Sequence, residues 1–510
     1  TKLGFVLAGI AAPYVIEISN IEHRACPKKF RIPIPRSVSR ACFDTQHVER
    51  SATSLYKLKE KEGHIMKIRS CILASLAMYF VILAAGGMAA DAPALTPLGA
   101  ESAGNTDGTI PPWTGGITSP PNGYKKGDHH SDPYPEDKIL FTISSANVND
   151  YKAKLSPGHV ALMEKYPTFK MNVYPTRRSA SLPQRVYDAT IANGKTAQLT
   201  KDGNAVTGAT GGIPFPTPKS GQEAIWNHLL RYRGDAVLHT INHAPVTKSG
   251  DYTLIKTEDD WYFHYYKAGR SSRKPDDTIF CCMQSIKAPP SVAGVILLME
   301  EPRDITKKQR SVWQYTPGQR RVTRLPDVSY DFLFSGVDGL RTIDQYDMFM
   351  GATDRYDWKL LGKRELYVPY NAYKLHSDSL KYTDILKPGH INTGYARCEL
   401  HRVWVVDATV KKGRKHLYPR RTFYLDEDSW QIVVEDVYDE NGRLWRVSEG
   451  HVINYYEAPC IATTLEVRYD LQSGRYIAEG LDNEDRMYDF SIKRTPGDYT
   501  PSEMRRLGKR

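Results

Sequence analysis

The sequence predicts a mainly β (α+β) fold, either a large curved antiparallel sheet or a half-open β-barrel with covering helices. Three observations support this prediction. After Gly234, apolar and polar residues alternate with a period of two, which is typical of half-buried strands. Short turns rich in Gly, Asn and Asp separate these segments. The chain also contains 32 Tyr and 8 Trp, and both residue types favour strands.

The clearest strand pattern lies in the C-terminal third. Short turns such as Lys412-Gly413 and Asp439–Gly442 link its segments, and short turns make neighbouring strands antiparallel. We therefore expect a meander that is either open and strongly curved or nearly closed. The expected strands are His401–Lys411, His416–Leu425, Gln431–Tyr438, Leu444–Val447, His451–Tyr456, Thr463–Leu471 and Arg475–Gly480.

Helix signals precede these strands. A short helix begins after Pro157-Gly158, and a firmer one begins at Ser220, an N-cap that forms a capping box with Glu223; Gly234 is its stop signal. The segment Asp338–Tyr356 is expected to be helical or irregular. Further strands are expected at Ala236–Thr247, Asp251–Lys256, Trp261–Lys267, Val292–Glu300, Val312–Tyr315 and Arg321–Leu325.

A secretory signal peptide is predicted at residues 66–89. Met66 is followed by basic Lys67 and Arg69, by an uncharged apolar run, and then by small residues, with cleavage expected after Ala89. The apolar run of about 14 residues is short for a bilayer span of roughly 20, so a membrane anchor is the weaker alternative. Residues 1–65 are interpreted as a spurious or disordered extension, with a basic cytoplasmic tail as the alternative.

The mature chain is predicted to have two parts. Residues 90–150 form an extended Pro/Gly-rich arm with turns, not a packed element, and residues 151–510 form a single antiparallel β domain with helices. Asp128, His129, His130 and Asp132 in the arm carry metal-ligating groups. Neighbouring polar residues in a loop are usually only solvated, so no metal site is predicted there.

The net charge and the cysteine content limit the functions that we expect for this chain. Of the net charge of +11, residues 1–65 contribute +5, which leaves only a mild positive charge on the mature part, and no basic block interleaves with aromatic residues, so a nucleic-acid partner is not expected. The mature part has four cysteines, which allow three pairings. An oxidising compartment permits disulfides without requiring them, so the pairing of Cys281, Cys282, Cys398 and Cys460 stays open.

Five stretches of the sequence resemble the bacterial family called domain of unknown function 1329. They are Gly108–Gly116, Glu223–Gly234, Asp354–Leu360, His401–Val406 and Phe423–Trp430. The resemblance covers about Leu95 to Arg510. It implies a distant similarity to LolA and LolB, the periplasmic lipoprotein carrier and its outer-membrane receptor, which have a half-open antiparallel barrel covered by helices and an apolar cavity for acyl chains. The family offers no catalytic residues to carry over.

The resemblance and the residue pattern favour a periplasmic binding or carrier protein for a lipid, an acyl chain or another hydrophobic ligand. Several strands are apolar on both faces, so one face of a curved sheet is free to line a cavity whose burial of apolar surface drives binding. The candidate wall residues are Trp313, Tyr315, Trp404, Val406, Phe423, Trp430, Ile432, Trp445 and Tyr455. For each of them, ordinary core packing is the simpler interpretation.

Two other functions stay open. The chain could be a non-catalytic assembly partner of an outer-membrane or transport complex, docking through its arm or the basic end Arg505–Arg510. An envelope hydrolase is the second alternative, although no Gly-x-Ser-x-Gly elbow stands between a strand and a helix. We predict no catalytic residues, no metal and no cofactor.

Overall fold

The computed structural model describes residues 94–266, 278–305, 307–326, 328–333 and 335–509. These residues belong to one compact unit, Pro93–Arg510. The predicted extension at residues 1–65 and the predicted signal peptide at residues 66–89 lie outside the described residues. Among the described residues, no helix combines the length and the apolar character needed to cross a bilayer.

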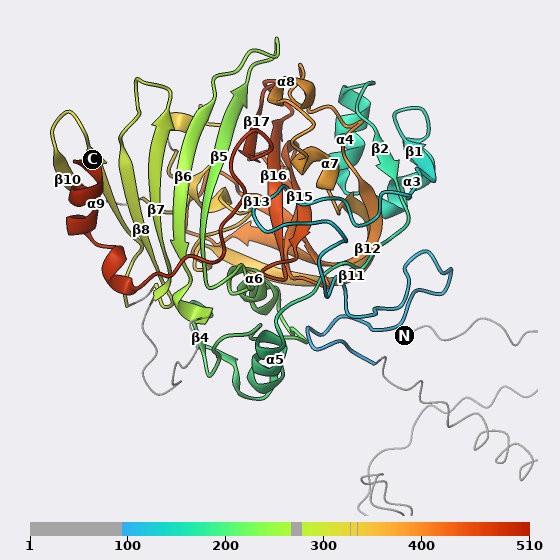
Figure 1. The fold of residues 1–510 in the computed structure, drawn as a ribbon. Helices are drawn as coiled ribbons and strands as arrows, with labels where there is room; N and C mark the ends of the chain where they lie inside the picture. Colours follow the sequence, from blue (N-terminus) through green and yellow to red (C-terminus); the bar gives the residue numbers. More distant parts are fainter. Residues whose placement is uncertain (1–93, 267–277, 306, 327, 334, 510) are drawn as a thin grey trace, which may run out of the picture. The chain divides into compact units, whose positions relative to one another are not determined.

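A strongly curved sheet of fifteen strands dominates the described residues (Figure 1). The order is β1-β2-β12-β13-β14-β15-β16-β17-β5-β6-β7-β8-β9-β10, and β11 also pairs with β12. All the pairings are antiparallel except the short contact of β2 with β12. The strands are β1 Phe141–Ile143, β2 Met171–Val173, β5 Ala236–Val246, β6 Ile255–Tyr262, β7 Thr278–Ala288, β8 Ile296–Pro302, β9 Ser311–Thr316, β10 Arg321–Leu325, β11 Tyr356–Pro369, β12 Cys398–Val410, β13 Arg420–Asp426, β14 Ile432–Tyr438, β15 Leu444–Tyr455, β16 Cys460–Asp470 and β17 Tyr476–Leu481.

This architecture confirms the predicted fold class, and the C-terminal meander is present as β12 to β17. The last strand, β17, pairs with β5, so the early strands β5–β10 continue the same sheet. Leu444–Val447 and His451–Tyr456 were expected as two strands but form the single strand β15. The long strand β11 was not predicted, because its stretch Lys359–Glu365 is rich in charged residues and only partly buried.

Helices cover both faces of this sheet. Their bounds are α3 Val148–Tyr151, α4 Pro157–Lys165, α5 Gln184–Thr196, α6 Gly221–Leu229, α7 Tyr373–His376, α8 Tyr382–Ile385 and α9 Pro501–Gly508. As predicted, Ser220 caps α6, with its hydroxyl accepting the Glu223 N–H at 3.2 Å. The Glu223 carboxylate accepts from the Lys219 N–H at 2.5 Å rather than from Ser220, so the capping box is incomplete. A separate two-stranded sheet pairs β3 Gln198–Leu199 with β4 Val206–Thr207.

The two faces of the sheet are covered by different elements. Residues directly opposite in register share a face, so Phe423, Glu435, Ser448 and Arg468 lie on one side. This side contacts α6 and the segment 341–350, which we call the plug segment, and we call it the plug face. The opposite face packs against α4, α7 and, over β8–β10, against α9.

The Pro/Gly-rich arm, predicted at residues 90–150, is irregular only from residue 94 to 140, because β1 and α3 begin within its last ten residues, and it is packed against the sheet. Leu98, Ala100, Ile110 and His130 are buried. Trp430 donates its indole N–H to the Leu98 carbonyl oxygen at 3.0 Å. The expectation of an unpacked arm was therefore wrong, because side chains far along the sequence supply the partners that an extended segment lacks locally.

The four cysteines among the described residues, Cys281, Cys282, Cys398 and Cys460, are free thiols and are buried. Cys281 and Cys282 lie next to each other on β7 and point to opposite faces, as alternation along a strand requires. Burial raises the pKa of the Cys281 thiol to about 12, so this group is a packing residue rather than a reactive one.

Candidate ligand-binding cavities

Five of the nine predicted wall residues gather in one buried cluster on the plug face. Val406, Phe423, Trp430 and Ile432 pack against Ala224 and Ile225 of α6 and against Phe349, while Trp404 borders the cluster. The Trp404 and Trp430 rings stack with centroids 6.1 Å apart. At these residues α6 and the plug segment lie against the sheet, where a ligand was expected from the sequence.

The other four predicted wall residues lie apart from these five and mostly from each other. Trp313 and Tyr315 lie beneath α9, where the Tyr315 hydroxyl donates to the Gly508 carbonyl oxygen at 3.0 Å. Trp445 donates its N–H to Asp470 at 3.1 Å. Tyr455 stacks on Tyr488 with ring centroids 4.8 Å apart. None of the nine belongs to the walls of the two cavities described next, so their contact with a ligand stays a prediction.

Two adjoining cavities lie further along the same face, at β5–β7. The first, of about 100 Å³, we call the aromatic cavity. The second, of about 480 Å³, we call the groove cavity. Val237, His239, Ile241 and His243 of β5 line the aromatic cavity, and His243 lines both. Strand alternation brings these four side chains to one face, so the period-two pattern of Ala236–Thr247 was the signal that could have indicated them.

The wall of the aromatic cavity comes from strands that are distant in the sequence. Besides the β5 residues, its lining consists of Arg233, Trp261, Phe263, Tyr346, Asp347, Ala462, Thr463, Glu466, Glu479, Gly480, Tyr488 and Phe490. The groove cavity is lined by His243, Pro245, Thr247, Asp251, Tyr252, Thr253, Ile255, Thr257, Gln284, Ile286, Pro289, Ser291, Val292, Gly336, Val337, Asp338 and Arg341. Apolar walls with a few polar groups are typical of small-molecule sites, which usually measure roughly 300–1,000 Å³.

A band of buried ion pairs joins the plug segment to the middle of the sheet. Arg421 of β13 pairs with Asp344 at 2.8 Å and with Glu435 at 2.6 Å. Arg341 donates to both oxygens of Glu479 at 2.8 Å. Burial raises the pKa of Asp344, but the positive charge of Arg421 outweighs this and holds that pKa well below its usual range. The middle of this face is thus filled and charged, and the aromatic and groove cavities lie to its side, at β5–β7.

The arginines at the aromatic cavity form ion pairs with neighbouring carboxylates. Arg231 and Arg233 both pair with Asp347 of the plug segment. Arg468 pairs with Glu466 and with Glu479, at 2.5 Å from the latter. Burial lowers the pKa of the His239 imidazole, which therefore faces the cavity as a neutral group.

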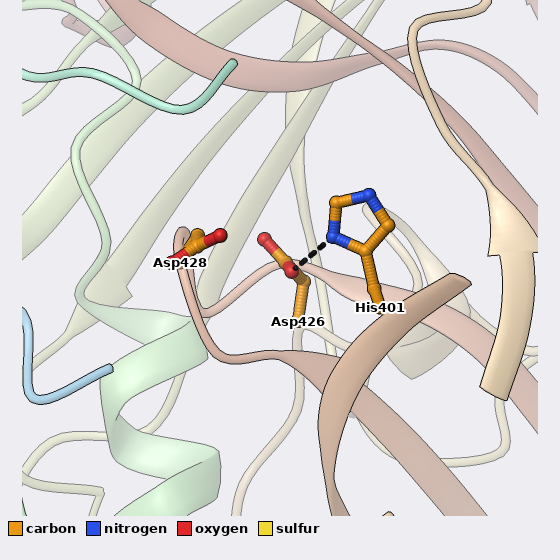
Figure 2. Close-up of side chains that lie close together, drawn as sticks. All are labelled: His401, Asp426 and Asp428. Carbon is orange, nitrogen blue, oxygen red and sulfur yellow. Dashed lines mark ion pairs between the residues drawn. The ribbon is translucent and has the colours of Figure 1, made fainter. Parts of the chain in front are cut away.

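A separate cluster contains His401, Asp426 and Asp428, whose ligand-type atoms lie within 4.8 Å of one another (Figure 2). It is the one such group among the described residues. His401 Nδ1 lies 3.3 Å from Asp426 and His401 Nε2 lies 3.2 Å from Glu399. Burial lowers the pKa of His401, but hydrogen bonds to these two carboxylates outweigh it and raise the pKa to about 9.

The charges of this cluster are already balanced by the protein. Both oxygens of Asp428 accept from Arg178, at 2.8 and 2.6 Å. The ring of Tyr370 stacks on His401 with centroids 3.9 Å apart, an arrangement that favours an imidazolium. The His401 imidazolium and the Arg178 guanidinium thus supply the positive charge, and we interpret the cluster as an ion-pair network. His130 of the arm belongs to another network and pairs with Glu457 at 2.6 Å.

The described residues thus define a β protein with one curved sheet, a charged plug on one face and two adjoining cavities beside that plug. The sequence comparisons identify the family. The chain belongs to the family described as "Protein of unknown function (DUF1329)", whose profile matches residues 142–505, as the sequence predicted. It is 45% identical over 418 residues to the "Uncharacterized protein PA3922" of Pseudomonas aeruginosa, a match covering 82% of this chain and 92% of that protein.

Three solved structures show similarity to this chain. A putative outer membrane lipoprotein-sorting protein domain from Vibrio parahaemolyticus is 12% identical, with a TM-score of 0.38, over 56% of this chain and 98% of that one. A DUF1329 family protein from Desulfovibrio piger is 13% identical, with a TM-score of 0.35, over 53% and 92%. The LolA superfamily protein NE2245 from Nitrosomonas europaea is 13% identical, with a TM-score of 0.33, over 56% and 100%.

Proposed function

We propose that the protein is a periplasmic binding or carrier protein for a hydrophobic ligand, and that the ligand occupies the groove cavity and the adjoining aromatic cavity. The observation that carries the proposal is the groove cavity of about 480 Å³. Its volume lies in the usual range for small-molecule sites, and its wall is largely apolar. Ile255 of β6 and Ile286 of β7 belong to that wall.

Burial of apolar ligand surface against this wall supplies the affinity. Each square ångström of apolar surface removed from water contributes about 25 cal/mol. The wall is built on paired strands, because Thr257 of β6 is directly opposite Ile286 of β7. A site on sheet strands is largely preformed, which reduces the entropy lost on binding. The periplasmic location rests on the signal-peptide pattern at residues 66–89.

The binding site is tested with N-phenyl-1-naphthylamine, an uncharged fluorescent hydrophobic probe. The full chain is expressed with its N-terminal region and purified from the periplasmic fraction, and probe fluorescence is titrated. We expect saturable binding, and recovery of a hydrophobic compound from an organic extract of the purified protein by mass spectrometry. Absence of the chain from the periplasmic fraction would refute the location.

A matched pair of variants assigns the binding to the groove cavity. Ile286→Trp fills this cavity with a larger side chain and should weaken probe binding at least about 10-fold, because the ring occupies the ligand volume. Ile191→Trp is the control, since Ile191 lies on α5 and is half exposed. No saturable binding by the unmodified chain, or equal binding by both variants, would overturn the proposal.

A further inference from the structure

We propose that the aromatic cavity selects an uncharged hydroxyl group on the hydrophobic ligand, and that His239 is the residue that recognises it. This inference rests on the proposed function, because it names the chemical class of the ligand bound at the same site. It makes the ligand an alcohol-type molecule and excludes a fatty-acid anion or an alkyl ammonium.

The first observation is the state of the His239 side chain. Neither ring nitrogen of His239 has a hydrogen-bond partner, although both are buried. The ring packs edge-on against Tyr488, with centroids 4.4 Å apart, in the wall of the cavity. A neutral imidazole carries one N–H donor, which can donate to the oxygen of a ligand hydroxyl and leaves the hydroxyl hydrogen free for another acceptor. A buried polar group without a partner is costly, and a ligand hydroxyl removes that cost at one ring nitrogen.

The second observation is a further unsatisfied atom beside His239. Asp259 is directly opposite His239 in the β5–β6 register, and the two side chains are 3.9 Å apart. Asp259 is fully buried, and its Oδ2 accepts from Gln284 at 3.0 Å and from Tyr346 at 3.1 Å. Its Oδ1 has no donor. A hydroxyl hydrogen, which a fatty-acid anion lacks, is the kind of donor that this oxygen needs.

The third observation concerns charge. In and around the cavity wall, four arginines are accompanied by four carboxylates; these residues are Arg231, Arg233, Arg341, Arg468, Asp259, Asp347, Glu466 and Glu479. Every one of these arginines is ion-paired with a carboxylate in this set. A carboxylate head would find every one of these arginines already paired, and an ammonium head would have only Asp259 as a partner. The desolvation of either charge in this buried site would oppose binding. A neutral head avoids that cost.

The size and position of the two cavities complete the argument. The aromatic cavity of about 100 Å³ is large enough for a head group and a short apolar stretch, but not for a whole lipid. His239 and His243 are four residues apart on β5, which corresponds to about 13 Å along a strand. His243 lines the groove cavity, so a hydrocarbon chain of that length, with its hydroxyl at His239, reaches the larger space.

Competition against N-phenyl-1-naphthylamine tests this class with three ligands that share one alkyl chain: n-decanol, decanoate and decylamine. The full chain purified from the periplasm should prefer n-decanol about 10-fold or more over either charged ligand. His239→Phe keeps the ring and removes both nitrogens, and it should weaken n-decanol binding about 5- to 10-fold, the size of one or two net hydrogen bonds. Probe binding should persist in that variant.

Two further variants separate recognition from folding. His239→Gln retains a donor and an acceptor and should keep most of the preference for n-decanol. Thr240→Val, the next residue on β5, alters the opposite face and should leave all three affinities unchanged. Probe binding with no preference for n-decanol, or with a preference for decanoate, overturns the hydroxyl assignment and leaves the binding function standing. Failure of the unmodified chain to bind the probe refutes the binding function itself.

Discussion

His130 Nδ1 lies 3.1 Å from His376 Nε2, which joins the N-terminal arm to α7. His130 Nε2 lies 2.6 Å from Glu457, and His376 Nδ1 lies 3.0 Å from Asp482. Both ring nitrogens of each histidine thus contact a partner, and burial lowers the pKa of His130.

The first prediction concerns this histidine pair. His376→Gln should lower the free energy of unfolding by about 2–3 kcal/mol, because it leaves buried partners of the pair unsatisfied. Urea unfolding measures the loss, and limited proteolysis should show earlier cleavage within residues 94–140. His129→Gln is the control and should change stability by about 0.5 kcal/mol at most, since His129 makes only a long contact of 3.4 Å to the Asp482 carbonyl oxygen and lies 4.0 Å from the exposed Asp378 carboxylate. Equal effects of the two substitutions would contradict the role of the pair.

The second prediction concerns His401, whose pKa is raised to about 9 from about 6.5 in the unfolded chain. A raised imidazole pKa stabilises the fold fully below about pH 6.5, and the contribution is lost as the pH rises through 9. The shift corresponds to about 3 kcal/mol. His401→Gln should therefore be less stable than the unmodified chain near pH 6, and the gap should narrow by about that amount above pH 9. A gap that does not change with pH, measured by urea unfolding, would refute the assignment.

The third prediction separates packing from ligand binding at Trp430. This residue is fully buried, and its N–H is bonded to the arm. Trp430→Ala should cost about 3–5 kcal/mol of unfolding free energy through the cavity it leaves. Trp313→Ala should cost less, since Trp313 is only half-buried. Neither change should alter the affinity for N-phenyl-1-naphthylamine under conditions where the variant is folded, and a selective loss of affinity in Trp430→Ala would place the ligand at the predicted wall instead.

The fourth prediction concerns the contact of α4 with the sheet. A Cβ atom at Gly158 would lie 2.1 Å from Asp436 Oδ1 and 2.6 Å from Val447 Cγ1. Gly158→Ala must therefore displace α4 or the strands, at an expected cost of about 2 kcal/mol or more. Gly318→Ala is the matched control, because a Cβ there has no neighbour within 4 Å. Thermal unfolding of both variants checks the prediction, and a stable Gly158→Ala protein would show that the helix does not lie this close.

The aromatic residues show where sequence reasoning on the site succeeded and where it stopped. Val406 and Phe423 were predicted as parts of one wall, and they are directly opposite each other in the register. Alternation along the strands did not reveal that α6 and Phe349 cover that face. The residues that line the cavities were passed over, because His239 and Asp259 look like ordinary polar positions in two strands. Their juxtaposition depends on the β5–β6 register, which the sequence does not state.

The sequence by itself determined the local structure. Period-two alternation and short turns specified the strands of the meander, and the Ser220 cap specified the start of α6. Both kinds of signal depend only on residues a few positions apart. The sequence also determined the family, through long matching stretches. Only the tertiary structure decided that β17 pairs with β5, that the arm is packed and that the plug segment fills the middle of one face. These features depend on contacts between residues that are often more than a hundred positions apart, whose free energy is shared among many partners and leaves no local pattern in the chain.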